Sequence, residues 1–282
     1  MKTYNKSDVL FSFEILNFDF ESNHQRNLIY DVHNKSKDGF ILKSVFSKEE
    51  VNQFLELTEN IQSNDFLNTN TGTIIPYPFA TISDLEGKLE SYISQKNRFE
   101  AFGFEKFLGK FDEIMRFIGS PFDVQVPKLR LDNSNAVPAT IRHFYPNMGG
   151  LFVHCGYLFQ EQSPIYYQAV EQMKKEGQLS FFVVLQQPES GGELTLYDMV
   201  WDNVNQKDYP ENNEFVIDKN REKVFLRDVV SEKFNPEPGD LLIFYGGRIW
   251  HRVEPILGSK PRITLGGFIN FSDDDKKCFY WS

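Results

Sequence analysis

The residues that could carry chemistry are concentrated in the second half of the chain, on short strand-like segments. His154 lies in "GLFVHCGYLF" and His251 in "RIWHRVEPI", and the sequence has only five histidines in all. Imidazole nitrogens are common ligands of transition metals such as iron. Residues two apart share one face of a strand, so Gly156 is expected to face the same side as His154. Many metal sites place a carboxylate at this position. Glycine would instead leave a hole beside the histidine.

An arginine follows the second histidine at a short interval. Arg262 begins the run "RITLGGFINF" and should share a strand face with Thr264 and Gly266. An interior guanidinium is costly unless it meets an anion, and a bidentate contact to a carboxylate would satisfy it. Taken singly, a strand histidine usually belongs to the core or the surface, and such an arginine usually extends to solvent. Their combination predicts a metal site beside an anion clamp.

The elements around these residues change character near residue 137. The first third is expected to form helices on a short strand. Residues 47–62 begin with a capping-box pattern, Ser47 and Glu50. Residues 100–120 carry an apolar stripe of helical period, typical of a core helix. A strand is expected over 39–46 and a helix over 163–177. The many short strands after 137 favour a sandwich or small barrel. They include "ATIRHFY", "GLFVHCGYLF", "LSFFVVLQQ", "GELTLYD", "KVFLRDV", "GDLLIFY", "RIWHRVEPI" and "RITLGGFINF".

Composition limits the possible partners. The formal net charge of -10 argues against nucleic acid, since phosphate contacts need a basic face. No stretch is long and apolar enough for a membrane span. The two cysteines, Cys155 and Cys278, form no disulfide framework or zinc pattern. The N-terminal "MKTYNKSDVLFSF" lacks the apolar region of a secretory signal. These features predict a soluble cytoplasmic protein, and they say little about a small-molecule substrate.

Four segments together resemble the core of the iron(II)/2-oxoglutarate-dependent oxygenases. They are "YPNMGGLFVHCG", "ESGGELTLYD", "PGDLLIFYGGRIWHRV" and "RITLGGFINF", and the resemblance covers about 137–271. It implies a mainly β fold with flanking helices, built on a double-stranded β-helix or jelly-roll core. It also implies that His154 and His251 bind Fe(II) and that Arg262, with Thr264 beside it, binds the far carboxylate of 2-oxoglutarate. Gly156 stands where the family pattern has a carboxylate.

A narrower resemblance extends over most of the chain. "VPATIRHFY", "VHCG", "QLSFFVVLQQPESGGELTLYDMVW" and "DGFILKSVF" resemble the carrier-protein-independent radical halogenases, in particular those that chlorinate hapalindole-type indole alkaloids. The resemblance implies a single domain over 1–282, with a helical support (1–136), a jelly-roll core (137–275) and an insertion (202–222). It implies Fe(II), 2-oxoglutarate and chloride as cofactors, O2 as cosubstrate, and a free small-molecule substrate with no obligatory carrier protein. The implied reaction chlorinates an unactivated aliphatic C–H bond.

Within that resemblance the glycine has a physical explanation. Two neutral imidazoles and dianionic 2-oxoglutarate leave Fe(II) formally neutral. A halide beside Gly156 would restore the single negative charge that a protein carboxylate supplies, and the missing side chain would give it room. On this argument alanine at 156 should serve almost as well as glycine.

Further residues are weaker candidates. Tyr145 is expected to help bind 2-oxoglutarate, and Arg142 is left out because the two should lie on opposite strand faces. Ser180 could bias the reaction through hydrogen bonds near the iron, or could simply bond to backbone. The other residues considered are Glu193, read as structural; Asp198 and Asp202, ligands only if their loop folds inward; His143, read as core; and Phe152 and Trp250, which could shape a substrate cavity.

Three functions remain open from the sequence. The first is a radical halogenase. The second is a hydroxylase or desaturase with a two-histidine iron site, in which water takes the place of the carboxylate. The third is a jelly-roll binding protein without catalysis. Arg262 argues against the third, because a clamp without its cosubstrate would be a buried unpaired charge.

Overall fold

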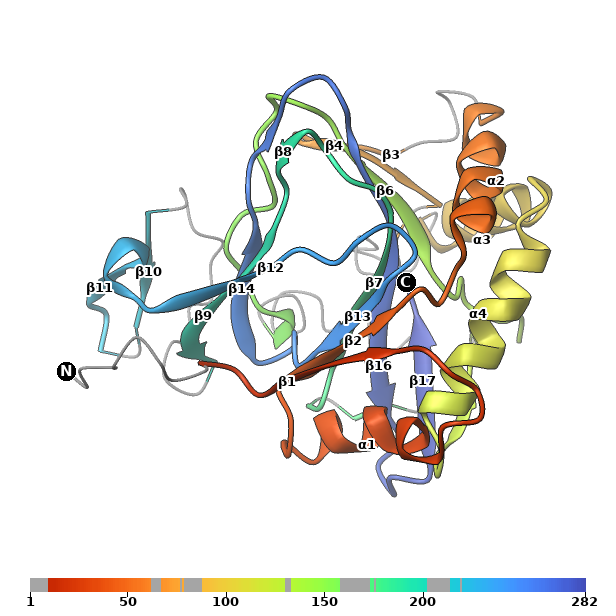
Figure 1. Ribbon diagram of the computed structural model, residues 1–282, viewed down its shortest axis with the longest axis horizontal. Helices are drawn as coiled ribbons and strands as arrows, with labels where there is room; N and C mark the ends of the chain where they lie inside the picture. The colour runs from red at the N-terminus through yellow and green to blue at the C-terminus, as the bar shows by residue number, and fades with distance from the viewer. Residues whose placement is uncertain are drawn as a thin grey trace.

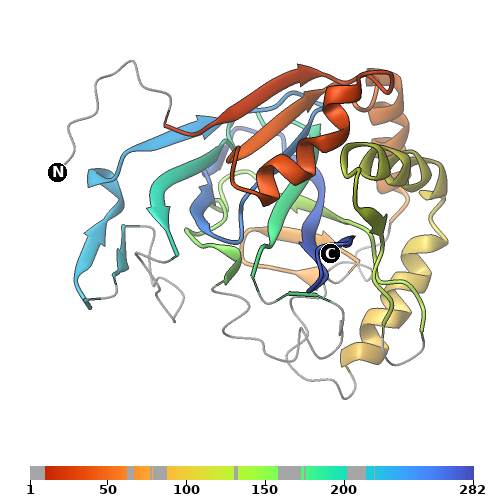
Figure 2. The same cartoon turned by 90° about the horizontal axis from the view of Figure 1, so that it is seen from below.

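A computed structural model describes residues 10–61, 67–76, 78, 88–129, 133–157, 173–174, 176–201, 214–218 and 220–282. Two sheets face each other in it, with helices packed outside the larger one (Figures 1 and 2). This arrangement is mainly β with flanking helices, as the sequence predicts. No helix among the described residues is long and apolar enough to cross a membrane.

The larger sheet, here called the main sheet, has ten strands in the described part of the chain. Its order is β1-β2-β13-β7-β16-β6-β4-β3; β17 also pairs with β16, and β5 with β17. Only β1–β2 and β5–β17 are parallel pairs. The strands are β1 (Phe13–Asn17), β2 (Gly39–Lys43), β3 (Leu67–Asn68), β4 (Gly72–Ile75), β5 (Asp123–Gln125), β6 (Thr140–Phe144), β7 (Leu179–Gln186), β13 (Leu241–Phe244), β16 (Arg262–Phe271) and β17 (Lys277–Trp281).

The opposing layer, here called the minor sheet, is a three-stranded sheet in the order β12-β9-β14. Two pairs of short strands extend the β-layers. The bounds are β9 (Leu194–Val200), β12 (Ser231–Phe234), β14 (Ile249–Val253), β8 (Ser190–Gly191), β15 (Ile256–Leu257), β10 (Phe215–Ile217) and β11 (Lys223–Phe225).

Helices cover the main sheet on the side away from the minor sheet (Figure 1). The apolar stripe of α4 is core, as predicted: its Phe111 packs against Phe181 of β7 and Tyr280 of β17. The predicted capping box of α2 is present, with Ser47 and Glu50 each accepting the other's backbone N–H. The helices are η1 (Asn23–Asn27), α1 (Leu28–His33), α2 (Lys48–Glu59), α3 (Lys88–Glu100), α4 (Glu105–Ile118) and η4 (Leu226–Asp228).

The first third is less helical than its pattern suggests. Residues 1–136 supply five strands to the main sheet, β1 to β5, where the sequence predicts only one. Strands β3, β4 and β5 are two to four residues long and polar or glycine-containing, so they show no clear alternation. Most of the predicted helix 163–177 and of the insertion 202–222 lies outside the described residues.

The predicted strand around His154 is irregular. His154 forms only an isolated antiparallel bridge with His251, and a helical turn begins at Gly156. The alternation of strand faces therefore stops between His154 and Gly156. This local break decides how the glycine sits relative to the histidine.

Candidate active site

The two histidines lie side by side on the minor-sheet layer. The backbone N–H of His154 donates to the His251 carbonyl at 2.9 Å, and the reverse bond measures 2.8 Å. This pairing adds the segment of His154 to the free edge of β14. Their ring centroids are 4.2 Å apart. A cross-strand pair of this kind can place two imidazoles on one ion.

The backbone fixes the tautomer of both rings. The Nδ1 of His154 lies 2.7 Å from the Phe152 carbonyl oxygen, and the Nδ1 of His251 lies 2.8 Å from that of Ile249. A carbonyl only accepts, so each Nδ1 must donate its proton. Each Nε2 then carries the lone pair. A backbone partner that orients the ring in this way is typical of metal-binding histidines.

Burial keeps both rings neutral. Burial lowers the pKa of His251 to about 4. The pKa of His154 lies well below its ordinary value, first because of burial and then because of the nearby charges of His251 and Arg142. Neutral imidazole is the form that binds a metal, so the pair needs no proton release near neutral pH.

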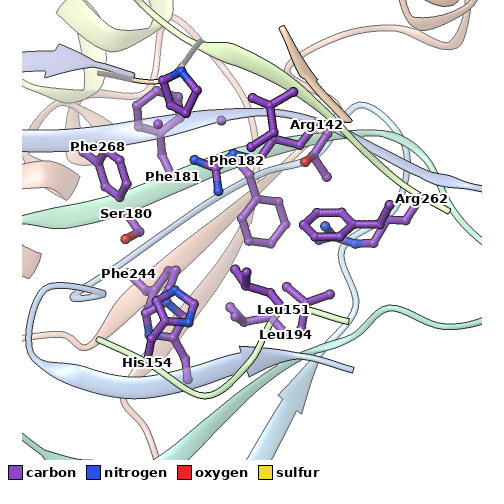
Figure 3. A pocket seen from close by; sticks show the side chains of 18 of the residues that line it. Arg142, Leu151, His154, Ser180, Phe181, Phe182, Leu194, Phe244, Arg262 and Phe268 are labelled. Carbon is purple, nitrogen blue, oxygen red and sulfur yellow. The ribbon is translucent and has the colours of Figure 1, made fainter. Parts of the chain in front are cut away.

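A cavity of about 340 Å³ lies between the two sheets beside the histidines (Figure 3). Among the described residues, no aspartate or glutamate lines it, and no group of three or more His, Cys, Asp or Glu side chains could hold a metal. Its walls are mainly apolar, and its charged groups are two guanidiniums. The lining residues are Ile74, Pro78, Arg142, Phe144, Leu151, Phe152, His154, Ser180, Phe181, Phe182, Leu194, Phe244, His251, Val253, Arg262, Thr264, Gly266, Gly267 and Phe268.

Arg262 occupies the opposite end of this cavity from His154 (Figure 3). It is only 4% exposed, and its guanidinium lies over the rings of Phe182 and Phe144, at 5.0 and 5.8 Å from their centroids. Within the described residues it forms no ion pair. Burial lowers its pKa to about 10, and the charge of Arg142 adds to this effect. A buried guanidinium without a carboxylate calls for an external anion.

Thr264 lies two residues further along β16 and lines the same cavity. It is 2% exposed and stands directly opposite Arg142 on β6. The sequence prediction that Arg262 and Thr264 share one face is confirmed. Continuous pairing of β16 with β6 holds this face toward the cavity, while the register with β7 shifts between Ile263 and Thr264.

The sequence predicts that Tyr145 faces the cavity and Arg142 faces away, and the structure shows the reverse. The two do lie on opposite faces, but Arg142 lines the cavity and Tyr145 does not. The Tyr145 hydroxyl instead lies 3.2 Å from that of Thr73, and its ring meets His143 edge to face. The geometry therefore does not support the prediction that Tyr145 binds the cosubstrate, which stays a prediction. The sequence pattern set the alternation correctly but held no sign of which face was inside.

Gly156 does not face the cavity as predicted. Its N–H donates to the Gly246 carbonyl at 2.8 Å. A Cβ at this position would lie 2.7 Å from Nε2 of Gln178 and 2.8 Å from Cα of Gly247. The hole expected on the face of His154 is thus filled by Gln178. An alanine here would require a shift of the Gly247 backbone, so the packing does not support the expectation that alanine would serve almost as well.

Sequence comparison and fold agree on the class of protein. The family model of the carrier-protein-independent halogenase WelO5 matches residues 12–282. The chain belongs to this family. No curated protein sequence matches it.

Solved structures with a similar fold are iron(II)/2-oxoglutarate oxygenases, which have a double-stranded β-helix core. An N-substituted L-amino acid dioxygenase from Burkholderia ambifaria AMMD has 15% identity and a TM-score of 0.56 over 90% of each chain. Its complex with alpha-KG gives the same score and identity over 89% of each chain. A Pseudomonas putida prolyl-4-hydroxylase scores 0.45 at 15% identity, over 86% of this chain and 96% of its own. At 15% identity, the likeness to the Burkholderia ambifaria dioxygenase shows the fold alone.

The residues present fit the cofactors of this superfamily. Two lone-pair imidazole nitrogens suit Fe(II), and the buried Arg262 suits a carboxylate. No described residue supplies the third, carboxylate ligand. Glu193 stays off the cavity and uses its backbone carbonyl to accept from the Glu254 N–H. Asp198 is exposed on β9, away from the cavity, and Asp202 lies outside the described residues.

The remaining candidates divide between the cavity and the core. Ser180 lines the cavity, and its hydroxyl makes no hydrogen bond within the described residues, which argues against a purely backbone-bonding role. Phe152 also lines the cavity. Trp250 does not: it is fully buried in a separate cluster, near-parallel to Trp201 with centroids 6.2 Å apart. The sequence did not single out five cavity phenylalanines, because the chain has 28 of them; they are Phe144, Phe181, Phe182, Phe244 and Phe268.

Proposed function

We propose that this protein is a non-haem Fe(II)/2-oxoglutarate-dependent halogenase that chlorinates an unactivated aliphatic C–H bond of a free small molecule. One observation carries the proposal. A single cavity combines two neutral lone-pair imidazoles with the buried Arg262, and none of its described lining residues is a carboxylate. Membership in a halogenase family supports the same activity.

In this proposal each polar residue has a defined task. His154 and His251 hold Fe(II) through Nε2, and Arg262 with Thr264 binds the far carboxylate of 2-oxoglutarate. Bound iron, 2-oxoglutarate and O2 together supply the oxidant that removes a hydrogen atom from the substrate. Two neutral imidazoles add no charge to the iron, so a halide in place of the usual carboxylate keeps the charge that such sites carry.

The cavity walls determine what the substrate carbon meets. Apolar side chains such as Leu151, Leu194 and Phe182 exclude water and leave dispersion contacts to hold a carbon skeleton. Position then selects between halogen and hydroxyl transfer to the carbon. The Ser180 hydroxyl also lines the cavity. It could donate a hydrogen bond to a group on iron and so bias the choice between halogen and hydroxyl transfer.

The test is an anaerobic titration of the Fe(II) protein with 2-oxoglutarate, followed by charge-transfer absorption, with and without chloride. The proposal predicts that chloride shifts the spectrum and tightens binding, because it occupies an iron position. Sulfate at equal ionic strength serves as the control. No chloride effect beyond that of sulfate would refute the halogenase.

A hydroxylase or desaturase with a two-histidine site is the second candidate. The tight packing around Gly156 favours it to some degree, since the glycine has a reason to be there other than a halide. In that case water takes the open position. The chloride titration gives no shift, while succinate still forms from 2-oxoglutarate in air. The two readouts together separate the two enzymes.

A further inference from the structure

A second guanidinium shares the cavity and has no task in the proposed reaction. Arg142 lies on β6, directly opposite Thr264 of β16 and Ile74 of β4. Its Nε is buried and has no hydrogen-bond partner in the described part of the chain. Burial lowers the pKa of Arg142 to about 10, which still leaves it charged at neutral pH.

The charges of the site balance without Arg142. Fe(II) and Arg262 together carry three positive charges, and 2-oxoglutarate with one halide carries three negative charges. Arg142 adds a further positive charge, and no described carboxylate lines the cavity to offset it. An unpaired charge in a buried site costs several kcal/mol. One further anion is therefore expected when the site is fully occupied.

Arg142 also lies where a substrate could reach it. It is part of the wall between the main cavity and a neighbouring cavity of about 260 Å³, whereas Arg262 lines only the first. The second cavity is also mainly apolar, and its polar lining residues are Thr69, Asn70 and Thr71 from the β3–β4 turn, and Thr73 and His143 from the adjoining strands. It shares Ile74, Phe144, Leu151 and Phe152 with the main cavity.

We infer that Arg142 binds an oxyanion of the substrate, a carboxylate or a phosphate, while the apolar body of the substrate lies toward His154 and His251. The inference rests on the proposed function, because the charge balance assumes iron, 2-oxoglutarate and halide. It narrows the substrate class to small anionic molecules with an apolar part. The polar turn of the second cavity would then hydrogen-bond the rest of the anionic end.

One alternative follows from the same geometry. Arg142 is close enough to His154 and Arg262 to lower the pKa of both. It therefore lies near the space that 2-oxoglutarate would span, and it could bind a carboxylate of the cosubstrate instead. The experiment must separate these two anions.

The test compares ligands that share one apolar body and differ in the polar group, which is a carboxylate, a primary amide or a phosphate ester. The series begins with 3-phenylpropanoate, 3-phenylpropanamide and 3-phenylpropyl phosphate and continues with larger apolar bodies. Binding to the anaerobic Fe(II)–2-oxoglutarate–chloride protein is measured by calorimetry. The best acid or phosphate should bind at least about tenfold tighter than its amide, as expected for a buried charge pair. Comparing carboxylate with phosphate identifies the oxyanion. The preference should vanish in Arg142→Gln and return in part in Arg142→Lys.

Three results would overturn the inference: equal binding of acid and amide, no binding of any acid or phosphate at millimolar concentration, or a loss of 2-oxoglutarate affinity in Arg142→Gln equal to that in Arg262→Gln. Stability of the metal-free protein provides a readout independent of ligands. Arg142→Met should melt no lower than the native protein, because it removes a half-buried charge whose Nε has no hydrogen-bond partner among the described residues. If iron and 2-oxoglutarate fail to bind the native protein at all, the proposed function fails; if they bind normally, only this inference fails.

Discussion

The two walls of the cavity differ in charge. The minor-sheet side, with the His154 segment, presents two neutral imidazoles among apolar side chains. The main-sheet side presents Arg142, Arg262 and Thr264, with both guanidiniums charged and without a described carboxylate. A ligand between them would meet the proposed metal at one end and positive charge at the other. This asymmetry suits a dianionic keto acid that chelates through one end only, and it can be tested one wall at a time.

The largest effect is expected on the histidine wall. His154→Ala removes one of two nitrogen ligands from a site that has no described carboxylate, so iron affinity should fall by roughly 100-fold or more. Iron content after desalting under anaerobic conditions measures this. His24→Ala, at an exposed position, is the matched control and should retain native iron content. Native iron content in His154→Ala would show that the metal binds elsewhere.

A substitution on the guanidinium wall should affect binding of 2-oxoglutarate and leave binding of iron unchanged. Arg262→Gln should weaken 2-oxoglutarate binding by about tenfold or more while leaving iron content unchanged, since a charge-assisted carboxylate contact is lost. Arg227→Gln changes a side chain that is 80% exposed and should alter neither quantity. A loss of iron in Arg262→Gln equal to that in His154→Ala would mean that the two walls do not act separately.

The stability of the protein should be sensitive to a single methyl group at Gly156. Gly156→Ala places a Cβ 2.8 Å from the Gly247 Cα, and the resulting overpacking should cost about 1–3 kcal/mol of unfolding free energy. Gly109→Ala is the matched control: its Cβ meets nothing within 4 Å on α4, so helix propensity should stabilise it by up to about 1 kcal/mol. Urea denaturation compares them. Equal stability of both variants would contradict the packing seen at Gly156.

The smallest expected effect is on the pH dependence of stability, and it comes from His143, the neighbour of Arg142 on β6. Burial lowers the pKa of His143 to about 4, so protons bind preferentially to the unfolded chain. Its contribution to stability is complete above pH 6.5 and is lost progressively as the pH falls toward 4. Between pH 7 and 5 the loss should be about 1–2 kcal/mol, and His143→Gln should remove that part of the pH dependence. An unchanged slope in His143→Gln would exclude this assignment; His24→Gln should leave the slope intact.

The sequence predicted the regular strands well and the irregular ones poorly. β16 is long and paired on both edges, so the shared face of Arg262 and Thr264 followed from alternation alone. The capping box of α2 is equally local. Alternation also separated Arg142 from Tyr145 but could not say which was inside, since that depends on the layer opposite β6. At Gly156 the strand gives way to a helical turn, and tertiary contacts with Gln178 and Gly247 decide the geometry.

The central claim is that an exogenous halide completes a metal site built on His154 and His251. It is tested most directly by crystals grown anaerobically with Fe(II), 2-oxoglutarate and bromide, with anomalous difference maps collected at the iron and bromine edges. We predict an iron peak between the two Nε2 atoms and a bromine peak bonded to that iron. An iron site with water in that position, or with a carboxylate from any part of the chain, would contradict the account.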